Sequence, residues 1–439
     1  MDDRSSSIAN DLADEIGVDE IAANKITANS VVTFGCRLNI YESQVIRQNM
    51  LEAGSVNLMV FNTCAVTKEA ERQAKKAISK AKRDNPDIKI IVTGCAAQYN
   101  PQEFASMPEV DKVIGNEEKL IPSSYSLDEQ RVLVNDIMSV TETASHLVSH
   151  FDGRTRAFLQ IQNGCNHRCT FCMIPLARGN SRSVPIGKIS QHIEELLNNG
   201  YQEIVFTGVD ITDYGLDLPG TPSLAQMITR VLQLNPGLKR LRLSSIDVAE
   251  IDERLFEMMA YEPRLMPHYH ISLQSGDDMI LKRMKRRHNR GQVIEFCHKL
   301  RSIKPQVSFG ADIIAGFPTE TDEMFANTKN LIDQAGLQFL HVFPYSARPD
   351  TPAARMPQVD KMLRKRRAAI LRLSGQEQLA KFLTNNIGAK SCALSEGGDL
   401  GYTENFIKVK FASSALANSI HKVRLLNIID NNQMLAEII

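Results

Sequence analysis

The run from Gly164 to Cys172 gathers three cysteines in one short segment, with three residues between Cys165 and Cys169 and two between Cys169 and Cys172. A loop this short has to turn its thiols toward one point. Three thiolates can hold three irons of a cubane cluster and leave the fourth iron open to a substrate. His167 lies inside the loop and offers the alternative of a Cys3His zinc site. Structural zinc sites usually draw further ligands from a distant pair, which this run lacks, so the spacing favours iron and sulfur.

The composition is that of a globular protein with room for two or three domains. Of the 439 residues 43% are hydrophobic, and no stretch approaches the roughly 20 apolar residues of a membrane span. Residues 1–27 are polar and acidic and are expected to form a loose tail or a marginal helix, without the apolar core of a secretory signal. Eight cysteines without an export signal indicate a reducing compartment, the cytoplasm, in which cysteines are ligands or buried thiols.

Acidic and basic residues balance at 51 each, so net charge neither predicts nor excludes a nucleic acid partner. Basic residues do gather locally, in Lys282–Arg287 and in Lys361–Arg367. Such runs are either solvated helix faces or contacts to phosphates, and the sequence leaves both interpretations open.

A second set of cysteines follows three predicted strands near the N-terminus. The apolar runs 31–34, 58–61 and 88–93 end in Gly35-Cys36, Asn62-Thr-Cys64 and Gly94-Cys95. Helices are predicted between them, one over 41–53 and one that begins after Thr67. This alternation predicts a Rossmann-like parallel sheet, whose strands end at one edge. Cys36, Cys64 and Cys95 are therefore expected to converge there, as a second three-thiolate cluster site.

From about residue 150 strands and helices alternate again. The candidate strands are 157–162, 203–207, 240–244, 268–273, 307–314 and 339–344, and the helices between them include 189–198 and 224–234. Six such units fall short of the eight that close a full barrel, so an open, partial (β/α)6 TIM-type barrel is predicted. The loops after its strands are expected to form the active site. The cofactor contacts assigned from these loops are Thr207, Asp210, Ser244, Gln274, Gly316 and Phe317.

The last part of the chain reads as a succession of short strands, among them 401–406, 408–411 and 422–426. This pattern predicts a small β-barrel. The predicted fold class is thus α/β with three domains after the tail. These are a parallel-sheet domain over residues 28–140, the partial barrel over 150–380, and the small C-terminal barrel over 385–439.

The glycine, the three spaced cysteines and the aromatic Phe171 after the first barrel strand resemble the radical S-adenosylmethionine superfamily. The resemblance implies that the open iron binds the methionine end of S-adenosylmethionine. It also implies that an electron from the cluster cleaves this cofactor to a 5′-deoxyadenosyl radical, which abstracts hydrogen. The protein then has to hold the cofactor and exclude water.

The motifs Gly35-Cys36-Arg-Leu-Asn39, Asn62-Thr-Cys64 and Gly94-Cys95 resemble the N-terminal domain of the methylthiotransferases, which join it to a radical barrel and a small TRAM domain. Among their three subfamilies, the run Thr33–Ser43 is similar to the MtaB type. This resemblance implies methylthiolation of carbon 2 of N6-threonylcarbamoyladenosine beside the tRNA anticodon. The subfamily that modifies isopentenyladenosine is the first alternative. A zinc-stabilised RNA-binding adaptor without catalysis is the alternative from another class.

The resemblance also implies the cofactors and partners. Two [4Fe–4S] clusters are expected: one on Cys165, Cys169 and Cys172 that cleaves S-adenosylmethionine, and an auxiliary one on Cys36, Cys64 and Cys95 that carries the sulfur. Both open irons are expected to face one cavity. The partners are the tRNA anticodon stem-loop, a low-potential electron donor of the flavodoxin or ferredoxin type, and a sulfur donor. Arg178, Arg182 and the run Lys282–Arg287 are expected to meet RNA phosphates, and the TRAM-like domain to hold tRNA.

Overall fold

The structure is a computed structural model that describes residues 29–127, 130–142 and 155–439, so the predicted tail of residues 1–27 lies outside the described residues. The chain divides into two units. Of the described residues, the N-terminal unit comprises those up to residue 142 together with Gln160–His167 and Cys172–Val184. The C-terminal unit comprises residues 155–159, Arg168–Phe171 and Pro185–Ile439. None of the described helices is long and apolar enough to cross a membrane.

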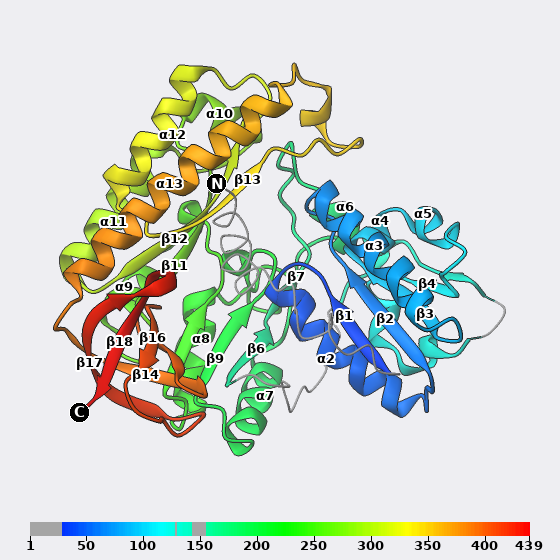
Figure 1. The fold of residues 1–439 in the computed structure, drawn as a ribbon, viewed down its shortest axis with the longest axis horizontal. Coiled ribbons are helices and arrows are strands. Elements are labelled where there is room, and N and C mark those ends of the chain that lie inside the picture. The colour runs from blue at the N-terminus through cyan, green and yellow to red at the C-terminus, as the bar shows by residue number, and fades with distance from the viewer. Residues whose placement is uncertain (1–28, 128–129, 143–154) are drawn as a thin grey trace. The chain divides into compact units, whose positions relative to one another are not determined.

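A parallel sheet in the order β1-β2-β3-β4-β5 is the centre of the N-terminal unit (Figure 1). Its strands are β1 (Ser30–Thr33), β2 (Leu58–Thr63), β3 (Lys89–Gly94), β4 (Lys112–Ile114) and β5 (Val132–Leu133). The helices are α2 (Arg37–Glu52), α3 (Lys68–Asp84), α4 (Cys95–Tyr99), α5 (Pro101–Ala105) and α6 (Ile174–Arg178). Two short strands, β7 (Gln162–Asn163) and β8 (Arg182–Ser183), form a separate antiparallel pair. The predicted parallel sheet is confirmed, with two short strands, β4 and β5, that the sequence analysis missed.

Both faces of this sheet are covered, which explains why β2 is apolar over four consecutive residues, 58–61. Leu58 and Val60 of β2 pack with Ile46 of α2 in one core. Met59 and Phe61, which point the other way, pack in a second core with helices α3 and α5. Helix α3 begins where the sequence predicts, because the Thr67 hydroxyl accepts a hydrogen bond from the Ala70 amide at 3.1 Å.

Six parallel strands of the C-terminal unit form two linked three-stranded sheets, in the orders β10-β9-β6 and β11-β12-β13. The strands are β6 (Arg156–Gln160), β9 (Glu203–Thr207), β10 (Arg240–Leu243), β11 (His268–Gln274), β12 (Ser308–Ala315) and β13 (Phe339–Pro344). A parallel bridge between Ile246 and Ile271 joins the two sheets. Within the described residues β6 and β13 are not paired with each other, so the predicted partial barrel is confirmed.

Amphipathic helices cover the outer side of these strands. They are α7 (Ile186–Asn198), α8 (Leu224–Leu234), α9 (Glu253–Tyr261), α10 (Asp278–Met284), α11 (Arg290–Ile303), α12 (Asp322–Ala335) and α13 (Lys361–Asn385). Figure 1 shows α11, α12 and α13 side by side against β12 and β13. Phe309, Ala311 and Ile313 of β12 face these helices and are fully buried. The alternate residues of β12 therefore face the interior of the barrel.

A closed barrel of five strands ends the chain, in the order β14-β15-β16-β18-β17. The strands are β14 (Lys390–Gly397), β15 (Leu400–Thr403), β16 (Lys408–Phe411), β17 (Ile420–Ile429) and β18 (Gln433–Ile438). Their inward residues form a separate core that includes Val409, Val423 and Met434. The small C-terminal barrel predicted from the alternating pattern is confirmed.

The loop after β15 closes the amino-terminal end of the larger barrel. The Phe406 ring stacks on His268 of β11 with ring centroids 4.6 Å apart. The Arg242 side chain of β10 donates to the backbone oxygens of Thr403 and Glu404 at 2.8 and 2.9 Å. The Arg156 guanidinium of β6 lies over the Phe406 ring, 5.4 Å from its centroid, and forms an ion pair with Glu396 of β14 at 2.7 Å. This loop is thus used inside the protein, so its aromatic Phe406 is not available to RNA.

Candidate active site

The N-terminal unit brings Cys36, Cys64 and Cys95 together at the carboxyl edge of its sheet, as the strand-end pattern predicts. They follow β1, β2 and β3, and Cys36 and Cys95 also begin helices α2 and α4. A Cβ atom on Gly35 would lie 2.7 Å from Cys64 Cβ and 2.8 Å from its sulfur, so the backbone beside Cys36 touches Cys64. Cys36 and Cys64 therefore lie close together, and Cys95 is near enough to both to raise the pKa of their thiols.

The electrostatics of this trio favour a bound cation. Burial, and then the neighbouring Cys95 and Cys36, raise the pKa of the Cys64 thiol to about 12. Burial also raises the pKa of Cys36, although the Arg178 guanidinium opposes this shift. Thiols with such pKa values stay protonated at neutral pH unless a metal supplies positive charge. The site therefore suits iron, which binds the thiolate form.

A buried charge cluster lies beside the trio. Glu42 of α2 accepts two hydrogen bonds from Arg178 of α6, at 2.7 and 2.9 Å, and one from Lys119 at 2.7 Å. All three side chains are at most 1% exposed. Two cations against one carboxylate leave a net positive charge, which favours an anionic thiolate cluster.

The prediction that Arg178 and Arg182 meet RNA phosphates is wrong. Arg178 is fully buried in the ion pair with Glu42, and Arg182 is only 3% exposed. Sequence reasoning recognised their charge but not the partner, because Glu42 lies 136 positions away along the chain from Arg178. Arg178 instead fastens the segment that follows Cys172 to the helix that follows Cys36.

Gly94→Ala is expected to remove the auxiliary cluster. Gly94 has a φ of 94°, and an added Cβ would collide with the backbone of Thr63, next to Cys64. Cys95 could then not keep its place, and iron content should fall from about eight to about four per chain. Gly54→Ala is the matched control, because Gly54 also has a positive φ, 64°, but has nothing within 4 Å. Equal iron loss in both variants would contradict the argument from close packing.

In both sets of cysteines, backbone amides lie close to cysteine sulfurs. The amide of His167 lies 3.4 Å from Cys165 Sγ, and the amide of Ile174 lies 3.4 Å from Cys172 Sγ. In the first trio the amide of Val66 lies 3.5 Å from Cys64 Sγ in the same way. In each case the donor is two residues after the cysteine. Such N–H donors stabilise thiolate charge and tune the reduction potential of iron–sulfur clusters.

Cys169, which belongs to the C-terminal unit, has a cationic neighbour. The Arg286 guanidinium lies 3.6 Å from Cys169 Sγ and donates to Asp247 at 2.9 Å and to the Ser272 carbonyl at 2.8 Å. Asp247 also accepts from His288 at 3.2 Å, which fixes its orientation. Sequence reasoning placed Arg286 in a phosphate-binding run, whereas the structure turns it inward, toward the cysteine loop.

The six predicted cofactor contacts all lie at strand ends of the C-terminal unit. The buried Ser244 hydroxyl, just past β10, has no hydrogen-bond partner among the described residues. Gln274 ends β11 with a φ of 69°, a conformation that a residue with a side chain rarely adopts and that often marks a functional site. Phe317 is buried edge-to-face against Phe171, with centroids 6.4 Å apart. An unpaired buried hydroxyl and a strained strand end are the features expected where a ligand binds.

The other three contacts are held by their own loops. Asp210 accepts a hydrogen bond from Thr212 at 2.9 Å, and Thr207 ends β9 fully buried. The Gly316 amide donates to Glu320 at 3.0 Å, and Glu320 in turn pairs with Arg367 of α13. These contacts fix the loops at the carboxyl ends of the strands, while the role of each residue toward the cofactor stays a prediction.

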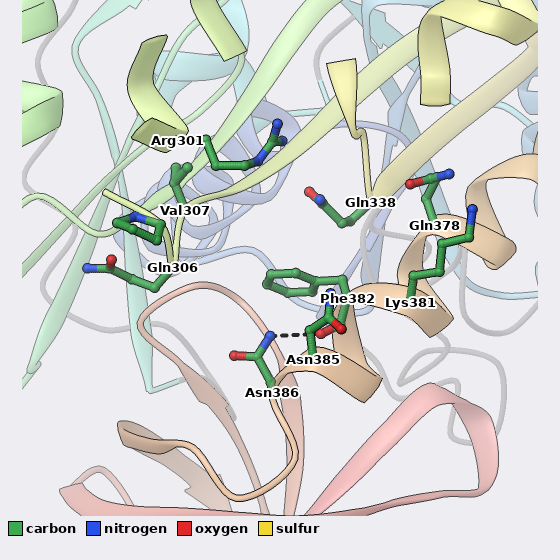
Figure 2. Close-up of a pocket in the computed structure, with 10 residues that line it drawn as sticks. Arg301, Gln306, Val307, Gln338, Gln378, Lys381, Phe382, Asn385 and Asn386 are labelled. Carbon is green, nitrogen blue, oxygen red and sulfur yellow. Dashed lines mark hydrogen bonds between the residues drawn. The ribbon is translucent and has the colours of Figure 1, made fainter. Parts of the chain in front are cut away.

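A separate pocket of about 460 Å³ lies at the opposite ends of the strands. Figure 2 shows it between α13, which contributes Phe382 and Lys381, and the segments that lead into β12 and β13, which contribute Gln306 and Gln338. None of the residues predicted for the site lines it. The pocket is therefore not a candidate for the reaction site.

Comparison with known proteins decides the family. Residues 29–115 match the uncharacterized protein family UPF0004, and residues 159–332 match the radical SAM superfamily. The chain is 63% identical over 398 residues to the threonylcarbamoyladenosine tRNA methylthiotransferase MtaB of Rickettsia prowazekii, over 91% of this chain and 94% of the relative. The chain belongs to the MtaB type of the radical S-adenosylmethionine methylthiotransferases. It is an enzyme that works with S-adenosylmethionine and two [4Fe–4S] clusters, which favours the cluster interpretation over zinc.

More distant relatives of this methylthiotransferase include a further MtaB protein and, at lower identity, a member of the other tRNA-modifying group. It is 36% identical to MtaB of Bacillus subtilis, over 90% of this chain and 92% of the relative. It is 30% identical to the tRNA-2-methylthio-N(6)-dimethylallyladenosine synthase of Ehrlichia canis, over 89% and 92%. Among solved structures, the radical S-adenosylmethionine methyltransferase TsrM of Kitasatospora setae has a TM-score of 0.54 at 14% identity, covering 72% of this chain and 74% of that one. The last likeness shows the fold alone.

Both cysteine sets of this methylthiotransferase fit the iron–sulfur clusters on structural grounds. In the first set, crowded thiols, of which Cys64 and Cys95 are buried, lie beside a buried charge cluster of net positive sign. In the second, two backbone amides and the Arg286 guanidinium point at the sulfurs. Protonated thiols in such surroundings gain from replacing their protons with iron.

Proposed function

We infer that this enzyme transfers a methylthio group to carbon 2 of N6-threonylcarbamoyladenosine at position 37 of tRNA. The observation that carries the proposal is the 63% identity to a named MtaB over nearly the whole length of both chains. Both sets of three cysteines stand on the carboxyl sides of strands, where parallel α/β folds carry out their chemistry.

The proposed roles divide between the two cysteine sets. Cys165, Cys169 and Cys172 hold the cluster that binds S-adenosylmethionine, and Cys36, Cys64 and Cys95 hold the auxiliary cluster. When bound, these groups supply a 5′-deoxyadenosyl radical and the sulfur atom to be transferred. The prediction that the two open irons face one cavity stays a prediction.

The protein's own residues hold and shield these groups. Arg286 places a cation beside Cys169, and Asp247 holds that cation in position. The Ser244 hydroxyl and the Gln274 strand end offer polar contacts to the cofactor. Phe171 and Phe317 keep water from the loop that carries the cysteines. A low-potential electron donor of the flavodoxin or ferredoxin type and a sulfur donor complete the proposal.

Cations that remain exposed are proposed to contact the tRNA backbone. Lys282 and Lys285 on and after α10 stay exposed, whereas Arg286 does not. On the C-terminal barrel, Lys390 pairs in register with Arg424, so that exposed cations lie side by side on β14 and β17. Such contacts position a nucleic acid without reading its sequence. The target base then has to leave the anticodon-loop stack to reach the site.

The substrate assignment is tested with the reconstituted enzyme, a chemical reductant and S-adenosylmethionine. Anticodon stem-loops that carry threonylcarbamoyladenosine or isopentenyladenosine at position 37 are supplied together, and the nucleosides are analysed by mass spectrometry. We expect the 2-methylthio product on threonylcarbamoyladenosine with a preference of at least about 100-fold, since a polar site rejects a hydrocarbon arm strongly. Preferential modification of isopentenyladenosine would overturn the assignment.

A further inference from the structure

Two histidines and one aspartate outside the cysteine sites meet inside the partial barrel. Asp312 Oδ1 of β12 lies 3.0 Å from His270 Nε2 of β11 and 3.1 Å from His341 Nδ1 of β13. The three strands are neighbours in one sheet, and Asp312 is directly paired with His341 in register. The cluster therefore rests on a rigid part of the fold.

The cluster faces the interior of the barrel. Ala311 and Ile313, the neighbours of Asp312 along β12, are fully buried toward the helices, so Asp312 points the opposite way. Its side chain is nevertheless 24% exposed, compared with 6% for His270 and 12% for His341. Since β12 has a paired strand on each side, this accessible surface lies inside the barrel. A ligand in the barrel can reach the carboxylate.

In its ionised form, the Asp312 carboxylate leaves one oxygen, Oδ2, to accept a hydrogen bond from a ligand. Burial acts to raise the pKa of the Asp312 carboxyl, but the two imidazoles more than offset this and hold the pKa below its usual value. An ionised carboxylate only accepts hydrogen bonds, so both ring nitrogens donate to Oδ1. Among the described residues no hydrogen bond reaches Oδ2. This oxygen is available to an N–H or O–H group.

The cluster lies beneath the residues that surround Cys169. His270 and Ser272 are two positions apart on β11, about 7 Å apart along the strand. The Ser272 carbonyl holds Arg286, which contacts Cys169. Below the cluster, His268 is stacked on Phe406 and the barrel is closed. A substituent that enters the barrel past Cys169 therefore reaches Asp312.

We propose that His270, Asp312 and His341 bind the polar arm on N6 of the substrate adenosine, with Asp312 Oδ2 accepting from its N–H and O–H groups. The inference rests on the proposed function, in which this arm is a ureido-linked amino acid. Such an arm supplies N–H and O–H donors to Oδ2, while its own carboxylate has to lie away from Asp312. A hydrocarbon arm would leave a charged oxygen in the barrel without a partner. The cluster thereby selects the substrate. Gly310 gives the cluster room, because a Cβ at this position would collide with the His270 ring.

The test uses Asp312→Asn in the full, cluster-loaded enzyme. The amide can still accept from the histidines, but it offers a donor in place of Oδ2. Dissociation constants are measured by fluorescence anisotropy for two stem-loops that differ only in having threonylcarbamoyladenosine or adenosine at position 37. We expect the preference of the wild type for the modified loop to fall by about 10- to 100-fold, with binding of the unmodified loop unchanged. Asp333→Asn, on the exposed face of α12, is the control and should keep the preference.

Several readouts keep the outcomes distinct. Iron content and formation of 5′-deoxyadenosine report whether the Asp312→Asn variant is folded. If it is not, His341→Gln, which alters one of the two donors to Asp312, is tested in its place. We expect a smaller loss of preference for this variant. An unchanged preference in the folded variant overturns the site. The metal content of both proteins is measured by mass spectrometry. If the wild type holds one equivalent of zinc or manganese and Asp312→Asn does not, the cluster is a metal site and the proposed binding of the arm is overturned. If the wild type itself forms no methylthio product on threonylcarbamoyladenosine, the proposed function fails as well as the site.

Discussion

Cys64→Ala is expected to stop methylthio transfer while S-adenosylmethionine is still cleaved. Cys64 lies in the crowded trio of the N-terminal unit, whereas Cys172 belongs to the separate motif whose sulfurs face backbone amides and Arg286. Cys172→Ala should therefore abolish both cleavage and transfer. The two activities are measured on the same samples as 5′-deoxyadenosine and as 2-methylthio nucleoside by mass spectrometry. Each variant should retain about four of about eight irons, because each loses one cluster.

Cys297→Ala is the matched control for both variants. Cys297 is a fully buried thiol in helix α11, outside both trios. Its replacement removes a buried sulfur without removing a ligand, so iron content and both activities should stay near those of the wild type. A loss of cleavage in Cys64→Ala as large as that in Cys172→Ala would contradict the division of roles between the trios.

The sequence was sufficient to predict elements whose signal is local. The strands over 203–207 and 339–344 and the helix over 224–234 have the predicted bounds, because an apolar pattern with clear ends suffices to define them. The convergence of Cys36, Cys64 and Cys95 was also predictable, since parallel strands that end alike bring their following residues to one edge.

Elements whose stability comes from distant partners were missed. Strands β4 and β5 have three and two residues, too few for a pattern, and exist because they pair with a neighbouring strand. Helix α2 begins at Arg37 rather than at Tyr41, because its first turns bury polar side chains such as Asn39 and Glu42, which pattern reasoning assigns to the surface. The buried partners of these side chains, Arg178 among them, come from far along the chain.

The same limit applies to the interior of the barrel. His270, Asp312 and His341 are single polar residues in three separate strands, and only the register between those strands brings them together. In the sequence, Arg286 is one residue of a basic run. Whether its side chain faces solvent or Cys169 depends on how the loop after α10 packs. Residue type indicates what chemistry a side chain can do, but pairing and packing decide what it meets.

Glu42→Gln is expected to destabilise the N-terminal unit by about 3–5 kcal/mol, because it leaves the buried Arg178 and Lys119 without their counter-charge. Helix α2 and helix α6 should lose the ion pair that joins them. Hydrogen–deuterium exchange followed by mass spectrometry measures this locally, as faster exchange in peptides from these two helices. Glu69→Gln is the control, since Glu69 forms an exposed pair with Arg72 on α3 and contributes little.

The same carboxylate gives the N-terminal unit a dependence on pH. Burial acts to raise the pKa of Glu42, but Arg178 and Lys119 lower it to about 2 from an ordinary value of 4.5. A pKa that is lower in the folded state means that ionised Glu42 stabilises the fold above pH 4.5 and that this contribution is lost as the pH falls toward 2. The difference in exchange between wild type and Glu42→Gln should therefore be full at neutral pH and shrink below pH 4.5. Arg178 follows Cys172 and Glu42 follows Cys36, so the ion pair is expected to hold the two cysteine segments in position. If the peptides of α2 and α6 exchanged no faster in Glu42→Gln than in Glu69→Gln, the positions of these segments would not depend on the buried ion pair.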